Sequence, residues 1–281
     1  METIPITRQS VQQLKEQYPE TANVPVTKKN TLPTITVKLP SKGYFYPASS
    51  PLSSGTIEIH QATAKHEDIL QNQQFLKKGI VLDEFLKAMI VTAGVSLDDL
   101  LIGDKNAIFI ATRISAYGED YSVKVKCPEC GEESKVTVDL SKVMDKEYDF
   151  GSLNKGDNKF SFQLPTSKKN ITWKLLTHKD ESLIESEIKS LAKFNNGASA
   201  PEITTRLKFL IVSIDGETDK GKIKKFIDES LPARDSLALR KEVKDKTPDL
   251  DMTFDFECVK CGHTAKISIP MNPEFFWPSN S

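Results

Sequence analysis

The sequence predicts an α+β protein built from two sequence-related units, each ending in a β-hairpin that carries a Cys-x-x-Cys motif. All four cysteines of the 281-residue chain lie in two such motifs, at residues 127–131 and 258–262, and a glycine closes each. Apolar and polar residues alternate on both sides of each motif, as in a strand with one buried face. Ahead of each motif, apolar residues recur at the spacing of an amphipathic helix. The two motifs are expected to meet in one zinc-ribbon-like site that joins the units.

Each unit is predicted to begin with two strands. Short runs rich in β-branched and aromatic residues occur at 34–39 and 56–60, and matching runs occur at 159–164 and 170–175. Such residues favour extended backbone, so we expect a pair of strands at the start of each unit.

Helices are predicted to follow these strands. Thr63 and Thr177 are good N-cap residues with acidic residues in the following turns, so a helix is expected to begin at each. A further helix is predicted over 82–91, with one apolar face made of Leu82, Phe85, Leu86, Met89 and Ile90. The corresponding face of the second unit is made of Ile203, Leu207, Leu210 and Ile211.

The last predicted helix of each unit starts with an aspartate. One begins near Asp104 and runs through Ile114, and its counterpart begins near Asp235 and ends before Pro248. The helix dipole stabilises a carboxylate at the N-terminus, and proline does not continue a helix.

The cysteine motifs are predicted to form the tips of two β-hairpins. The first motif lies between alternating runs at 121–126 and 133–139, and the second lies between runs at 252–257 and 264–269. A Cys-x-x-Cys turn lets two thiolates reach one ion, and the glycine after it permits a left-handed turn. Two tips together supply the ligand set of a tetrahedral zinc site. The predicted ligands are Cys127, Cys130, Cys258 and Cys261.

The predicted zinc, one per chain, is structural because four thiolates leave no open position for water. The competing interpretations are two local disulfides or inert thiols. His263 follows the second motif and is the nearest alternative ligand, but four cysteines already fill the shell. Redox Cys-x-x-Cys motifs usually open a helix beside a parallel strand, unlike either motif here.

Other positions also recur in the same order in both halves. Asp104 matches Asp235 at the spacing that separates the two motifs, and the Leu-Pro pair at 39–40 matches the pair at 164–165. Preserved order favours duplication over coincidental similarity. The predicted organisation is a flexible N-terminal arm at 1–31, a first repeat unit at 32–145, a linker at 146–157, a second repeat unit at 158–270 and an aromatic C-terminal tail at 271–281.

Composition argues against two functional classes. The formal net charge of −1 supplies no overall basic field for nucleic acid. Arginine, which grips phosphates and bases bidentately, occurs only as Arg8, Arg113, Arg206, Arg234 and Arg240. No apolar run reaches the length of a membrane span, and the polar N-terminus does not read as a signal peptide. We therefore expect a soluble protein that is made and used in a reducing cytoplasm.

No catalytic motif is recognisable in the chain. The four histidines lack the spacing of a metalloprotease site, and neither a serine nucleophile elbow nor a phosphate-binding loop occurs. We expect no enzymatic activity, no small-molecule substrate and no cofactor other than the structural zinc. An enzyme with an unrecognised site ranks third among the hypotheses.

The segment at 39–47 reads Leu-Pro-Ser-Lys-Gly-Tyr-Phe-Tyr-Pro, and it resembles the opening of baseplate hub proteins from T4-type contractile-tailed bacteriophages. The resemblance continues through the first cysteine motif and through the segments 64–70, 76–79, 100–107, 114–118 and 275–278. It implies a non-enzymatic structural or chaperone-like assembly protein of the baseplate hub, which binds other baseplate or tail proteins. It also implies a location in the host cytoplasm during assembly, and it leaves open whether the chain stays in the tail of the mature virion.

Three alternatives remain open from the sequence. We interpret the aromatic cluster at 44–46 as part of a structural turn at Lys42-Gly43. The competing interpretation is that these aromatic side chains bind a partner. The segment 273–278 places three large aromatics either at a partner interface or against the protein's own core. The alternative function is a zinc-ribbon nucleic-acid-binding or transcription-associated factor, which salt-sensitive retention of DNA or RNA would support.

Overall fold

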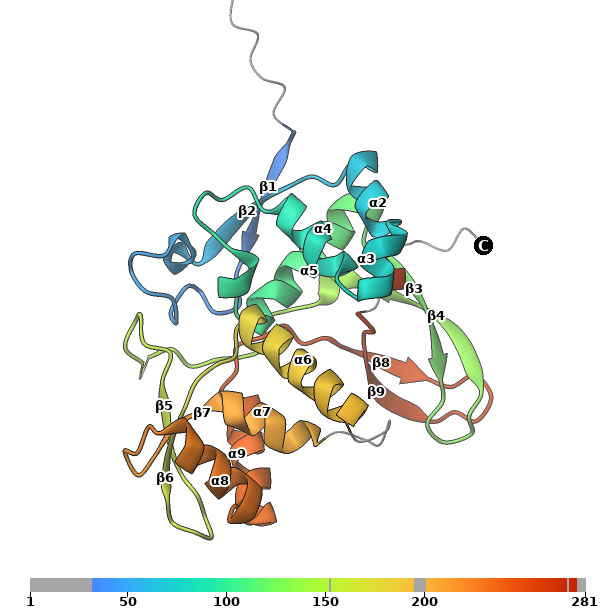
Figure 1. Ribbon diagram of the computed structural model, residues 1–281. Helices are drawn as coiled ribbons and strands as arrows, with labels where there is room; N and C mark the ends of the chain where they lie inside the picture. Colours follow the sequence, from blue (N-terminus) through green and yellow to red (C-terminus); the bar gives the residue numbers. More distant parts are fainter. Residues whose placement is uncertain (1–31, 152, 195–200, 272, 277–281) are drawn as a thin grey trace, which may run out of the picture. The chain divides into compact units, whose positions relative to one another are not determined.

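The computed structural model describes residues 32–151, 153–194, 201–271 and 273–276. The chain divides into a short N-terminal segment and a larger compact unit that begins at Thr34. The predicted N-terminal arm at 1–31 lies outside the described residues. Helices and small antiparallel sheets alternate along the larger unit, which confirms the α+β prediction (Figure 1).

The first half of the larger unit runs from a two-stranded hairpin, through helices, to the first cysteine hairpin. Its elements are β1 (Thr34–Lys38), η1 (Pro51–Ser54), β2 (Thr56–His60), α2 (Ala64–Leu70), α3 (Gln73–Lys78), α4 (Val81–Met89), η2 (Leu97–Asp99), α5 (Ile102–Tyr117), β3 (Asp120–Lys126), β4 (Glu133–Asp139) and η3 (Leu140–Lys142).

The second half follows a similar order and ends in the second cysteine hairpin. Its elements are β5 (Phe160–Gln163), β6 (Asn170–Trp173), α6 (His178–Phe194), α7 (Glu202–Leu210), β7 (Ile211–Ile214), α8 (Lys220–Glu229), α9 (Ala233–Asp245), β8 (Thr253–Glu257), β9 (Thr264–Ser268) and η4 (Pro273–Phe276). The predicted strand pairs, the helix starts after Thr63 and Thr177 and both cysteine hairpins are confirmed.

The helix predicted over 82–91 is too long at its C-terminal end. α4 ends at Met89, because Ile90 is extended and bridges Ile59 of β2. The backbone N–H of Val91 then donates to the Glu58 carbonyl at 2.9 Å. An extended segment after the helix therefore returns to the hairpin.

The same change of direction occurs in the second half and corrects the face assigned there. α7 ends at Leu210, and Ile211 begins β7, which pairs with β6 in the three-stranded sheet β5-β6-β7. Ile203 is 47% exposed and does not belong to a buried face, whereas Leu207 and Leu210 are buried.

Two short helices were not predicted, although their caps are visible in the sequence. α3 begins after Asn72, whose side chain accepts hydrogen bonds from two backbone N–H groups, and it ends at Gly79 with φ 71°. α8 begins after Asp219, whose carboxylate accepts from the Lys222 N–H at 2.8 Å. α3 is too short to show a strong periodic pattern, but in α8 the apolar residues Ile223, Phe226 and Ile227 do recur at helical spacing.

Asp104 has a different role from the one predicted for it. It lies in the first turn of α5 and is fully buried, but its carboxylate binds the distant Leu-Pro-Ser-Lys-Gly turn. Oδ1 accepts from the Ser41 N–H at 2.9 Å, and Oδ2 accepts from the Ser41 hydroxyl at 2.7 Å and the Tyr46 hydroxyl at 2.6 Å. The Tyr46 oxygen in turn accepts from the Leu101 N–H at 2.9 Å, just before α5. The turn and the helix start are thereby fixed to each other.

Asp235 makes the corresponding contact in the second half. It lies in the first turn of α9 and is also fully buried. Its two oxygens accept from the backbone N–H groups of Thr166 at 2.7 Å and Ser167 at 2.9 Å, which follow the second Leu-Pro pair. Both aspartates thus join the turn after the first strand of their half to the last helix of that half.

The two carboxyl groups are expected to give opposite pH dependences of stability. Burial raises the pKa of Asp104 in spite of its hydrogen bonds to Ser41 and Tyr46. Burial acts in the same direction on Asp235, but the N–H groups of Ser167 and Thr166 outweigh it and hold the pKa below its usual range. A raised pKa stabilises the fold at low pH, and this contribution is lost as the pH rises through the folded-state pKa. A carboxyl group whose pKa is lowered in the folded state stabilises the fold when the pH is above the ordinary, unfolded-state pKa. This contribution is lost as the pH falls through the folded-state pKa.

Urea unfolding of the wild type, Asp104→Asn and Asp235→Asn between about pH 3 and pH 7 tests this prediction. The free energy of unfolding of the wild type minus that of Asp104→Asn should increase as the pH falls. The corresponding difference for Asp235→Asn should decrease below about pH 4. If both differences changed in the same direction with pH, the assignment would be contradicted.

The aromatic cluster near Gly43 belongs to the core, as the structural-turn interpretation requires. Lys42 and Gly43 both have positive φ, and Phe45 and Tyr46 are buried. A Cβ at Gly43 would lie 2.5 Å from the Ser53 carbonyl oxygen, so glycine is required there.

The described C-terminal aromatics also pack inward, which excludes an interface role for them. Phe276 lies 5.0 Å from Phe85 and 5.5 Å from Phe109 between ring centroids, and Phe275 lies 4.9 Å from Tyr121. Phe275 and Phe276 are both fully buried. The remaining predicted aromatic, Trp277, lies outside the described residues.

Candidate metal centre

The two cysteine motifs fold into turns with the same backbone hydrogen bonds. The Gly131 N–H donates to the Cys127 carbonyl at 3.0 Å, and the Gly262 N–H donates to the Cys258 carbonyl at 2.8 Å. Gly131 has φ 72° and Gly262 has φ 69°, so both adopt the left-handed conformation that the sequence indicated. Each turn closes the end of its hairpin.

The structure brings the four predicted ligands together. Cys127 Sγ lies 3.7 Å from Cys261 Sγ, and Cys130 Sγ lies 3.6 Å from Cys258 Sγ. All four sulfurs lie within 4.8 Å of one another. Zinc–sulfur bonds of about 2.3 Å in a tetrahedron place neighbouring sulfurs about 3.8 Å apart. The cluster can therefore hold one tetrahedral metal ion with little rearrangement, and zinc fits both the spacing and the donor type.

Two of the four cysteines in the cluster are buried, and none of the four forms a disulfide. Cys127 and Cys258, the first cysteine of each turn, are buried, whereas Cys130 and Cys261 are exposed. Hydrogen bonds from the backbone N–H groups of Cys261 and Lys260 lower the pKa of the Cys258 thiol to about 7. At Cys261 the backbone N–H of His263 acts in the same direction, but the neighbouring thiols outweigh it and raise the pKa. Backbone donors of this kind stabilise the thiolate form, which is the form that binds metal.

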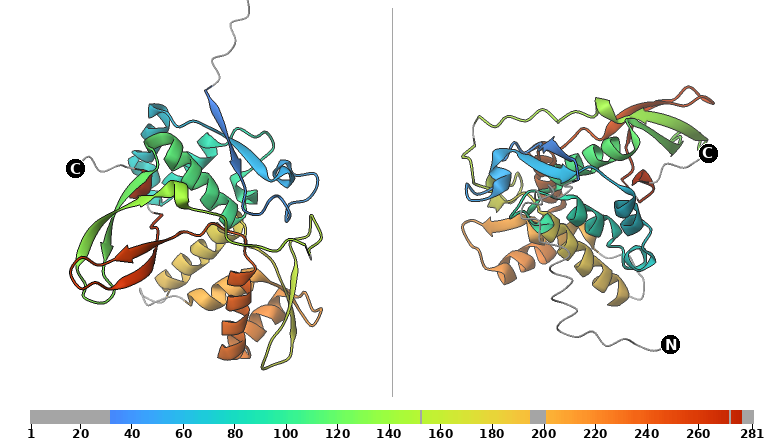
Figure 2. Two further views of the ribbon diagram at one scale, coloured as in Figure 1. Left: turned by 180° about the vertical axis from the view of Figure 1, so that it is seen from behind. Right: turned by 90° about the horizontal axis from the view of Figure 1, so that it is seen from above.

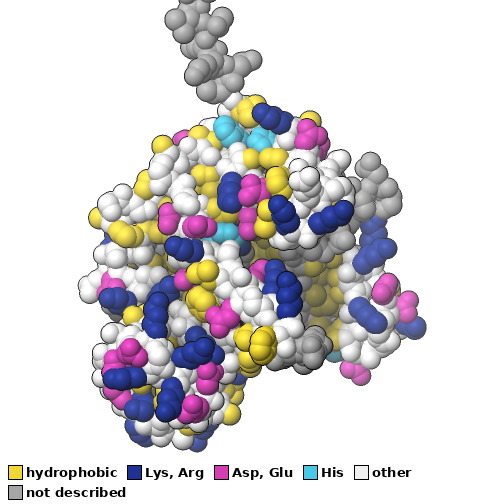
Figure 3. Space-filling model, viewed as in Figure 1, with side chains coloured by type: hydrophobic (Ala, Val, Ile, Leu, Met, Phe, Trp, Pro, Cys, Tyr) yellow, Lys and Arg dark blue, Asp and Glu magenta, His cyan; other side chains and the backbone are white. Residues whose placement is uncertain are grey.

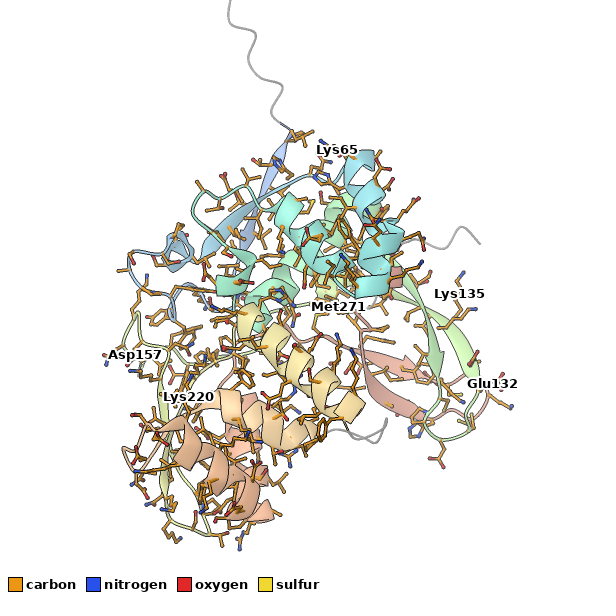
Figure 4. All side chains as sticks on the ribbon, in the orientation of Figure 1. Lys65, Glu132, Lys135, Asp157, Lys220 and Met271 are labelled. Atoms are coloured by element: carbon orange, nitrogen blue, oxygen red, sulfur yellow. The ribbon has the colours of Figure 1, made fainter. Side chains whose placement is uncertain are left out.

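Residues around the cluster support the turns without entering it. His263 accepts a hydrogen bond from the Cys258 N–H through its backbone carbonyl at 2.9 Å. Lys260 and Glu132 form an ion pair of 2.7 Å between the two tips. The surface around the hairpin tips carries acidic and basic side chains near one another (Figure 3). The label of Glu132 shows where the tips lie in Figure 4. An exposed pair of this kind contributes little by itself.

The bases of the two hairpins are joined by backbone hydrogen bonds. The Lys146 N–H donates to the Asp249 carbonyl, and the Asp251 N–H donates to the Met144 carbonyl, both at 2.8 Å. The hairpins lie side by side in all three views of Figures 1 and 2. Hydrogen bonds thus hold the bases together, while the cysteines gather at the tips.

A polar cluster that the sequence did not indicate also joins the halves. Lys105 Nζ of α5 lies 3.1 Å from His178 Nδ1 of α6, and His178 Nε2 lies 3.4 Å from Asp83 Oδ1 of α4. Burial lowers the pKa of Lys105. The backbone pairs there too, since the His178 N–H donates to the Leu100 carbonyl at 2.8 Å. No local signal could have found this cluster, because its residues lie far apart in the sequence.

These features define a class of protein: an α+β chain whose two cysteine hairpins meet in a four-sulfur cluster able to bind a metal. Among the described residues, no helix is long and apolar enough to cross a membrane. The chain belongs to the family described as T4 bacteriophage base plate protein, which matches residues 32–277. Comparison with curated proteins and with solved structures gives no match. The family assigns the chain to the baseplate of a phage tail.

Proposed function

We propose that this chain is a structural and assembly protein of the baseplate hub of a contractile-tailed phage, without enzymatic activity. Membership of the baseplate family supports the baseplate role. The assembly of the hub and the binding of other tail proteins are the more specific parts of the proposal. The chain works in the host cytoplasm during assembly and is carried into the tail of the virion.

A structural zinc ion stabilises this protein by joining its two hairpin tips. The observation that carries the proposal is the approach of four free thiols to the spacing of a tetrahedral site, two from each hairpin. The ligands are Cys127, Cys130, Cys258 and Cys261. With four thiolates bound, the ion has no open position for substrate or water, which argues for a clamp rather than a catalyst.

The halves arose by duplication of one unit, with boundaries at 32–145 and 158–270 and a linker at 146–157. The similar order of elements supports this proposal, as do the two buried aspartates at matching positions. Each half contributes one hairpin tip with two thiols. The metal therefore holds together two sequence-related units.

Affinity purification from infected cells tests the proposed function. A tagged full-length chain is expected to co-purify with identified baseplate proteins, and about one zinc ion per chain is expected in the same sample. A tagged Cys127→Ser/Cys258→Ser variant, which lacks the buried ligand of each hairpin, should lose both the zinc and the co-purifying proteins. Retention of nucleic acid alone, lost at raised salt, would instead support the nucleic-acid-binding alternative.

A further inference from the structure

The lining of a groove on the second half includes none of the metal-centre residues. The groove lies among α6, α7, β7 and α8 and has a volume of about 620 Å³. In Figure 3, the face over these helices carries hydrophobic side chains among basic and acidic ones.

The floor of the groove is apolar and open to solvent. Leu183 of α6 is 48% exposed, and Phe209 and Val212 are half-buried. None of the three belongs to the hydrophobic core of the described residues or packs against it. Large apolar side chains that line a concave surface outside the core are typical of a binding site for another protein.

The rim of the groove carries uncompensated positive charge. Lys220 and Lys224 of α8 line it one helical turn apart, and neither forms an ion pair with any described residue. The other two lining lysines already have partners, Asp180 and Asp228. Glu187 is the only lining carboxylate without an ion pair in the described part of the chain, so positive charge prevails at the rim.

The placement of these lysines is unfavourable for the isolated chain. Lys220 lies in the first turn of α8, where the helix dipole disfavours a cation. Lys220 and Lys224 are four residues apart, so their like charges repel on one helix face. Figure 4 labels Lys220 at the start of α8. An anionic partner removes both penalties.

The helix that carries the rim is also an addition to the pattern of the first half. α8 lies between α7 and α9, where the first half has only the short 3-10 helix η2 between α4 and α5. The groove is therefore a feature of the second half alone.

We propose that this groove binds an acidic segment, with large apolar side chains, of another protein of the phage tail. The proposal rests on the proposed function and names a surface for it. Apolar side chains of the partner fill the floor at Leu183, Phe209 and Val212. Its carboxylates pair with Lys220 and Lys224, and charge complementarity selects this partner over a basic one.

Site-specific photo-crosslinking in infected cells tests the proposal. A photoreactive amino acid replaces Leu183 in the tagged full-length chain, and the cross-linked peptides are identified by mass spectrometry. The control position is Leu237 of α9, which is 60% exposed and lies outside the groove. We expect the probe at Leu183, but not the one at Leu237, to capture an Asp/Glu-rich segment of one identified tail protein.

Charge reversal supplies the second part of the test. Lys220→Glu with Lys224→Glu should lower the cross-link yield by about tenfold or more, because two attractive contacts become repulsive. The matched control is Lys225→Glu with Lys241→Glu, two exposed lysines outside the groove lining, which should keep the yield within about twofold. Unchanged thermal unfolding of both double variants checks that each still folds.

The outcomes separate this proposal from the proposed function. Capture of a second copy of this chain, capture of nucleic acid, no capture, or equal yields from the two charge-reversed variants would each overturn the groove assignment. If the wild-type chain still co-purifies with baseplate proteins in those cases, only the groove fails. If the wild-type chain associates with no tail protein, the proposed function fails as well.

Discussion

Replacing Cys258 with serine is expected to abolish stable zinc binding and to lower the free energy of unfolding by about 5 kcal/mol or more. Cys258 is buried, and its sulfur lies 3.6 Å from that of Cys130 on the other hairpin. Loss of one thiolate opens the coordination shell and removes the metal link between the hairpin tips, which leaves only the exposed Lys260–Glu132 ion pair described there. Chelation of zinc from the wild type should have a similar effect, because binding free energy at a structural site contributes directly to folding.

Chemical unfolding with and without chelator, monitored together with zinc release, measures this effect. The matched control is Lys260→Ala, which breaks the ion pair with Glu132 between the same tips but leaves the thiols intact. Its expected cost is about 0.5 kcal/mol, since the pair is exposed. A Cys258→Ser variant that unfolds with the wild-type midpoint, or a wild type indifferent to chelator, would show that the thiols hold no structural metal.

Asp104→Ala is expected to destabilise the protein by about 3–5 kcal/mol, the second large effect. The substitution removes the acceptor for the Ser41 N–H, the Ser41 hydroxyl and the Tyr46 hydroxyl, all of which are buried. An unpaired buried donor costs about 1–3 kcal/mol, and the alanine also leaves a small cavity. The turn at Gly43 and the start of α5 should loosen together.

The matched variant is Asp104→Asn, which retains one acceptor of the same shape and should cost clearly less than alanine at neutral pH. Because burial raises the pKa of Asp104, the wild type itself bears a cost for the charged form there. Denaturant unfolding of the two variants, with amide hydrogen exchange at Ser41 and Leu101, measures the difference. Equal stabilities for Asp104→Ala and the wild type would contradict the role assigned to this carboxylate.

The sequence predicted the features whose signals are local. Strict alternation identified the two cysteine hairpins, because a strand with one buried face repeats every two residues. The spacing of Cys127 from Cys130 and of Cys258 from Cys261, each with a following glycine, predicted the turn geometry that the structure has. The prediction that the two tips lie close together rested only on chemistry, because four thiolates are the ligand set of one tetrahedral zinc ion.

Features that depend on distant partners were not predictable in the same way. Ile90 and Ile211 continue the apolar pattern of the preceding helices, yet each is extended because a strand far away in sequence pairs with it. Asp104 looked like a residue that interacts with its own helix dipole, but its carboxylate binds groups 58 and 63 residues away. The Asp83–His178–Lys105 cluster and the lysine-rimmed groove likewise arise from helices that meet only in the folded chain.

We propose that the two cysteine hairpins hold one zinc ion between them. X-ray absorption at the zinc edge, on protein purified from cells under anaerobic conditions without added metal, tests it most directly. We expect one zinc per chain with four sulfur neighbours at about 2.3 Å. A shell that contains nitrogen or oxygen ligands, a substoichiometric metal content or oxidised cysteine pairs in the native protein would contradict it.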